Sequence, residues 1–97
     1  MNPQPPNLDD LRANLHRAQL PADRLRAFSA ILFHPDALWS DILAGLDESP
    51  AIAEVAAVWL HVQLNVPHRG VVILDKTRWL TLLEQAGRSP SERVEPK

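Results

Sequence analysis

Apolar residues recur at three- and four-residue spacing along most of the chain, which is the pattern of amphipathic helices. The spacing predicts helices over residues 8–19, 21–33, 35–46, 50–65 and 76–86. The longest of them is also the most apolar. We therefore expect a mostly α protein, a compact bundle of four to five short helices around a central apolar helix at 50–65.

Capping residues stand where these helices should begin and end. Asn7 and Asp75 can accept hydrogen bonds from the first backbone N–H groups of the helices that follow them. Pro21 and Pro50 fit the first turn of a helix, where the missing N–H is not needed. Gly87 follows the last apolar position and favours a helix end there.

The helix predicted over residues 50–65 is apolar around most of its circumference, and a helix of that kind is buried on most sides. Its polar positions, Glu54, His61 and Asn65, fall within a narrow angular range at 100° per residue. We expect this strip to remain open to water or to a partner.

Residues 71–74, which read Val-Val-Ile-Leu, are the one segment inside the predicted domain that could form a strand. They are β-prone and follow a glycine, so they predict either a short strand or an extended segment that covers the core. A lone strand leaves its backbone groups unpaired. If residues 71–74 form a strand, its simplest partner is the same strand of a second copy, in a homodimer.

Composition divides the chain into a core region and two polar ends. Residues 1–7 are rich in proline and predict a disordered lead-in. Residues 8–87 predict a single helical domain, since a chain of 97 residues is the size of one domain. Residues 88–97 are polar and predict a disordered tail.

Several classes of protein are disfavoured by composition. The chain has no cysteine, so disulfides and cysteine-based metal or catalytic sites are excluded. It has no apolar run of about 20 residues, and residues 1–6 lack the features of a signal peptide. We expect a cytoplasmic protein without membrane association. Eight of its ten basic residues are arginine, which is typical of GC-rich bacterial genomes.

Charge is unevenly distributed along the chain, although the net charge is −2. Residues 27–68 contain no lysine or arginine. They contain five acidic residues: Asp36, Asp41, Asp47, Glu48 and Glu54. The segments before and after are mildly basic. An acidic middle between basic ends predicts ion pairs within the chain or with a second copy, or a solvated acidic face.

The tripeptide His34-Pro35-Asp36 lies between two predicted helices. It resembles the tripeptide that J-domain co-chaperones carry between their second and third helices. The resemblance covers these three residues. The strongly basic preceding helix of that family is represented here by Arg24 and Arg26 alone. We interpret the tripeptide as the point where one helix ends and the next begins, because the residue before a proline is disfavoured in a helix.

Residues suited to catalysis or metal binding are scattered. Glu54 and His61 could form an acid–base pair if their helix lined a cleft. His61 and Asn65 have the spacing of two ligands on one helix, but asparagine is a poor zinc ligand. We expect neither an enzyme, nor a metal site, nor a cofactor.

Binding is the function that the sequence favours, with a protein partner or a second copy of the chain. The expected surface combines the polar strip with the segment that follows it: Glu54, His61, Asn65, Arg69, Lys76, Arg78 and Trp79. Trp79 is expected to be partly exposed, since tryptophan at an interface contributes much binding energy. The alternative is a DNA-binding regulator or antitoxin-like protein that uses the basic residues of Arg69–Arg78.

Overall fold

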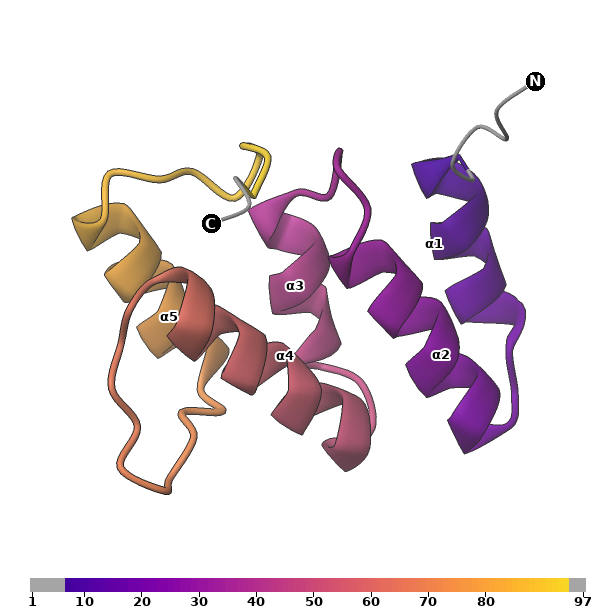
Figure 1. Ribbon diagram of the computed structural model, residues 1–97, viewed down its shortest axis with the longest axis horizontal. Coiled ribbons are helices and arrows are strands. Elements are labelled where there is room, and N and C mark those ends of the chain that lie inside the picture. Colours follow the sequence, from indigo (N-terminus) through magenta and orange to yellow (C-terminus); the bar gives the residue numbers. More distant parts are fainter. Residues whose placement is uncertain (1–6, 95–97) are drawn as a thin grey trace.

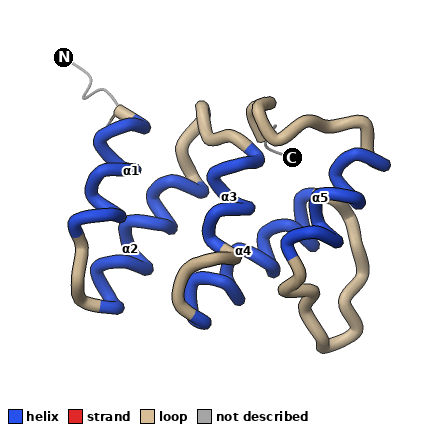
Figure 2. The backbone as a smooth tube through the Cα atoms, turned by 180° about the vertical axis from the view of Figure 1, so that it is seen from behind, coloured by secondary structure: helices blue, strands red, loops and turns tan. Residues whose placement is uncertain are grey.

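The computed structural model describes residues 7–94, which form five helices joined by loops and no strand (Figures 1 and 2). The helices are α1 (Leu8–Arg17), α2 (Pro21–Leu32), α3 (Trp39–Gly45), α4 (Pro50–Gln63) and α5 (Lys76–Gln85). The mostly α prediction is confirmed. Residues 71–74 do not form the strand that was considered for them.

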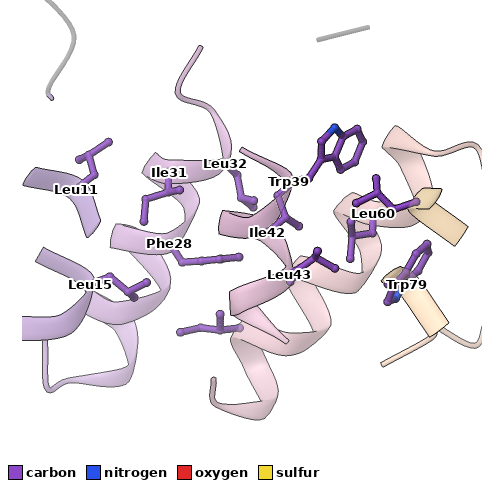
Figure 3. Packing of buried hydrophobic residues seen from close by; sticks show 13 residues of the cluster. Leu11, Leu15, Phe28, Ile31, Leu32, Trp39, Ile42, Leu43, Leu60 and Trp79 are labelled. Atoms are coloured by element: carbon purple, nitrogen blue, oxygen red, sulfur yellow. The ribbon is translucent and has the colours of Figure 1, made fainter. Parts of the chain in front are cut away.

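The helices follow one another across the molecule. Figure 1 shows α1 and α2 side by side at one end and α5 at the other, with α3 and α4 between them, and Figure 2 shows the same order from behind. All five helices contribute side chains to one buried cluster, which runs from Leu11 and Leu15 of α1 to Trp79 of α5 (Figure 3). The fold therefore has a continuous core that is shared by short helices.

The centre of the core depends on a close approach between α2, α3 and α4. Phe28 of α2 is buried, and its ring lies against Gly45, the last residue of α3. A Cβ atom on Gly45 would lie 2.3 Å from Cζ of Phe28 and 3.0 Å from Cβ of Ala56 on α4. Only a residue without a side chain fits in this space.

Local caps set most of the helix ends as predicted. Side-chain oxygens of Asn7 and Asp75 each accept a hydrogen bond from the backbone N–H two residues on, at 2.8 and 2.9 Å. Gly87 has a φ of 74°. Beyond it the N–H of Arg88 donates to the carbonyl of Leu83 at 3.0 Å. This is the hydrogen bond of a Schellman motif, which satisfies the end of α5.

Helix α3 begins four residues later than residue 35, where the sequence predicts it. The imidazole Nδ1 of His34 accepts a hydrogen bond from the N–H of Asp36 at 3.0 Å, and the carbonyl of His34 accepts one from Ala37 at 3.1 Å. These bonds close a turn, so the helix starts at Trp39. The local hydrogen bonds of His34 thus replace the first turn of the helix that the sequence predicts.

The C-terminal segment is ordered against the start of α3. The carbonyls of Glu92 and Pro90 accept hydrogen bonds from the N–H groups of Trp39 and Ser40, at 3.0 and 2.9 Å. These are first-turn N–H groups that have no partner within their own helix. The disordered tail predicted over residues 88–97 is thus wrong for residues 88–94. Residues 95–97, and residues 1–6 of the predicted lead-in, lie outside the described residues.

Candidate functional site

The long loop between α4 and α5 folds back over the end of α4 (Figure 1). Asn65 adopts a left-handed conformation with φ of 55°, and the N–H of Val66 donates to the carbonyl of His61 at 2.9 Å. Asparagine tolerates this conformation better than most residues. Asn65 thus ends α4 and turns the chain back toward the helix, and its side chain remains exposed.

His61 is buried by that loop, with 2% of its surface exposed. Its Nδ1 lies 2.8 Å from the carbonyl oxygen of Val66, and its Nε2 accepts a hydrogen bond from the N–H of Ile73 at 3.0 Å. A carbonyl can only accept and an amide N–H can only donate, so these bonds require the neutral ring with the proton on Nδ1. The expectation that His61 lies on an open strip is wrong, because the chain beyond the helix covers it.

Trp79 is also buried, with none of its surface exposed, so the partly exposed position expected for it is wrong. Its indole Nε1 donates to the carbonyl of Ile73 at 2.6 Å. Its ring meets that of His61 edge to face, with 4.8 Å between centroids. Two side chains thus satisfy the N–H and C=O of Ile73. The extended segment 71–74 covers the core without pairing as a strand, and the argument for a strand-paired homodimer no longer holds.

The basic residues of the predicted surface have different environments. Lys76 donates from Nζ to a carboxylate oxygen of Asp47 at 2.7 Å. Arg69 and Arg78 are exposed, and neither has an ion pair with another residue of the described range 7–94. Arg69 adopts a left-handed conformation, with φ of 47°, at the tip of the loop.

Ion pairs within the chain join the acidic middle to its basic flanks. They are Arg12–Asp41 (2.7 Å), Lys76–Asp47 (2.7 Å), Arg93–Asp36 (3.2 Å) and Arg24–Glu48. The first is a fork in which both oxygens of Asp41 accept from the guanidinium, and this hydrogen bonding raises the pKa of Arg12. Glu54 is exposed and, among the described residues, is the one acid of this stretch without an ion pair.

The part of α4 that remains exposed is apolar rather than polar. Val62 is 58% exposed and Val58 is 41% exposed, while Val55 and Trp59 beside them are half-buried. Phe33, just beyond α2, is 74% exposed and meets the ring of Trp59 edge to face at 5.0 Å. We call these five residues the α4 face. The sequence indicates this face only indirectly. Helix α4 is apolar around most of its circumference, and its short neighbouring helices cannot cover all of that apolar surface.

Two shallow pockets of about 340 and 380 Å³ flank Trp59. One also includes Phe33 and Gln63, and the other includes Glu54 and Val58. The indole N–H of Trp59 and the side-chain oxygen of Gln63 are enclosed and have no hydrogen-bond partner in the described part of the chain. Enclosed polar atoms of this kind are uncommon in folded proteins. The α4 face thus adjoins an unused donor and an unused acceptor.

Among residues 7–94, no three His, Asp or Glu side chains gather closely enough to hold a metal ion. None of the helices in the described range has the length and apolar character needed to cross a bilayer. Comparison of the chain with family models, curated proteins and solved structures gives no significant match.

Proposed function

We propose that this chain is a non-enzymatic protein-interaction module that binds its partner through the α4 face. The observation that carries the proposal is the exposure of large apolar side chains together on one side, above all Phe33 and Val62. Covering apolar surface yields about 25 cal/mol per Å². Contiguous exposed apolar patches are typical of sites that bind other molecules.

The aromatic pair at the edge of the α4 face supports a protein partner. Phe33 and Trp59 pack edge to face and leave part of each ring accessible. Tryptophan residues beside shallow pockets are frequent centres of binding energy at protein interfaces.

A non-enzymatic role agrees with the hydrogen bonding of His61, which is the best candidate for acid–base chemistry. Both ring nitrogens of His61 are engaged by backbone groups of Val66 and Ile73. The ring therefore has no free nitrogen with which to pair with Glu54 or to transfer a proton. Its two hydrogen bonds instead hold the loop between α4 and α5 in place.

Site-specific photo-cross-linking tests the proposal. A benzophenone amino acid at Val62 in the full-length chain should capture a discrete protein in a native extract, or a second copy of the chain. The same group at Gln85, which is exposed on α5 outside the α4 face, serves as the matched control. Capture from both positions alike, or from neither, would remove the α4 face as a binding site.

DNA binding is the second candidate function, favoured by the two exposed arginines, Arg69 and Arg78, that have no acidic partner in the described range. Phosphate contacts release counterions, so affinity must fall as salt rises. A titration with duplex DNA at two salt concentrations, with Arg69→Ala and Arg78→Ala as variants, checks this. No binding, or binding that salt and both variants leave unchanged, excludes it.

A further inference from the structure

The loop of residues 64–75, between α4 and α5, depends on a titratable side chain for its position. The ring of His61 bonds to this loop at two places, the carbonyl oxygen of Val66 at 2.8 Å and the N–H of Ile73 at 3.0 Å. Both bonds exist together only while the ring is neutral. A proton added to Nε2 would replace the acceptor with a second N–H, directed at the N–H of Ile73. The closed loop and the protonated ring therefore exclude each other.

No carboxylate forms an ion pair with the ring of His61 to compensate a positive charge. The neutral indole of Trp79 and the ring of His68 lie against it. The charged and titratable residues of the elements that pack on it are Glu54 of α4, His68, Arg69 and Asp75 of the loop, and Lys76, Arg78 and Glu84 of α5. Within residues 7–94, none of the acids among them pairs with either histidine. A proton on His61 would thus be a buried charge without a partner, which is unfavourable.

His68 responds to acid in the same direction. Its Nδ1 accepts a hydrogen bond from the N–H of Gly70 at 3.2 Å, which requires that this nitrogen carries no proton. Protonation of both rings would place two positive charges on His61 and His68, whose ring centroids are 5.1 Å apart. Like charges at this separation repel. Acid thus removes two acceptors of backbone N–H groups from one loop.

The closed loop also contains strained backbone. Arg69 has a φ of 47°, in the left-handed region that arginine rarely adopts. A residue persists in this region only where the contacts around it hold the chain there. The side-chain bonds that hold this loop on the helices come from His61 and Trp79. Losing the bonds of His61 therefore favours an open loop.

We infer that the loop of residues 64–75 is a pH-sensitive switch, closed while His61 is neutral and open when His61 takes up a proton. The open state binds more protons than the closed state, so a fall in pH favours opening. Imidazole in water takes up a proton at about pH 6.5, so the switch responds below neutral pH. Opening uncovers His61 and the ring of Trp79, which the closed loop keeps buried.

The opening is local, because the bonds that acid removes lie within α4 and the loop. Helices α1, α2 and α3 supply most of the buried cluster, and none of these bonds involves them. The switch does not depend on whether the α4 face binds a partner. Its failure would leave the proposed function unchanged, and the reverse is also true.

Hydrogen exchange of the full-length chain at about pH 7.5 and about pH 5 tests the switch, after correction for the intrinsic pH dependence of exchange. Uptake of one proton on opening should lower the protection of the Ile73 amide about 10- to 30-fold over this range. The amide of Ile31, in α2, should change by less than about 3-fold. Equal protection of Ile73 at both pH values overturns the inference. A parallel loss at Ile31 also overturns it, because the unfolding would then be global.

The variant His61→Gln assigns the effect to the ring. A glutamine oxygen can accept from the N–H of Ile73 but does not titrate, so the protection of Ile73 should change less than about 3-fold between the two pH values. The matched control is His16→Gln, at an exposed position of α1, which should keep the full effect. A pH effect that survives in His61→Gln contradicts the assignment.

A second variant decides the question if His61→Gln does not fold. The chain has four histidines, so replacing His16, His34 and His68 with glutamine leaves His61 as the only one. This triple variant should still lose at least about 5-fold of the protection of Ile73 between the two pH values. Constant protection in the triple variant would assign the pH effect to another histidine and overturn the role of His61. Circular dichroism at the higher pH shows that each variant is folded.

Discussion

His61 and Trp79 meet edge to face with 4.8 Å between their rings, and both hydrogen-bond to the same residue, Ile73. The imidazole accepts from its N–H and the indole donates to its C=O. Side chains thus do for Ile73 what a neighbouring strand would do in a sheet. This arrangement holds the extended segment 71–74 on the core and orders the loop between α4 and α5.

Replacing His61 with phenylalanine tests this anchor. The variant keeps an aromatic ring but leaves the N–H of Ile73 and the carbonyl of Val66 without partners. We expect the free energy of unfolding to fall by about 1–3 kcal/mol, the cost of an unsatisfied buried group. Urea denaturation followed by tryptophan fluorescence measures it. His16→Phe, at an exposed position of α1, should change stability by no more than about 0.5 kcal/mol.

The indole N–H of Trp79 can be tested by Trp79→Phe. This change keeps most of the apolar volume and removes the donor to Ile73, so we expect a loss of about 1–2 kcal/mol. The matched variant is Trp59→Phe, because the N–H of Trp59 has no partner among the described residues. Its effect should be the smaller of the two. Equal losses would mean that volume, and not the hydrogen bond, determines the result.

Gly45 should not tolerate alanine. The added methyl group would meet the ring of Phe28 at 2.3 Å, and that ring is buried and cannot move aside freely. We expect Gly45→Ala to lower the free energy of unfolding by about 1–3 kcal/mol, as overpacked cores do. Gly45→Ala combined with Phe28→Leu should cost less than the sum of the two changes. Strict additivity would contradict the contact.

Deleting residues 88–97 should destabilise the start of α3. The N–H groups of Trp39 and Ser40 lose their carbonyl partners, and we expect a loss of about 1–2 kcal/mol. Hydrogen exchange should show faster exchange at these two amides. Arg93→Ala, which removes only the exposed ion pair with Asp36, should change stability by no more than about 0.5 kcal/mol. A deletion that leaves both amides protected would show that α3 is capped without the tail.

The candidate site was predictable only in part. The exposed positions of Glu54, Asn65, Arg69 and Arg78 agree with a surface segment, whereas His61 and Trp79 are buried. Periodicity places His61 on the polar strip of α4, but it cannot show that the loop after the helix covers that strip. It also cannot show which part of an apolar helix its neighbours leave exposed. The importance of Val58 and Val62 is therefore visible only in the folded chain.

By itself, the sequence determined the helices and their ends, because caps and breakers act over a few residues. Asn7, Asp75 and Gly87 end or begin helices where their own chemistry places them. Tertiary structure decided the position of the C-terminal segment against α3, the burial of His61 and the exposed apolar side of α4. Each of these depends on contacts between residues far apart in the chain, such as Glu92 with Trp39 or Ile73 with His61, and local pattern does not encode them.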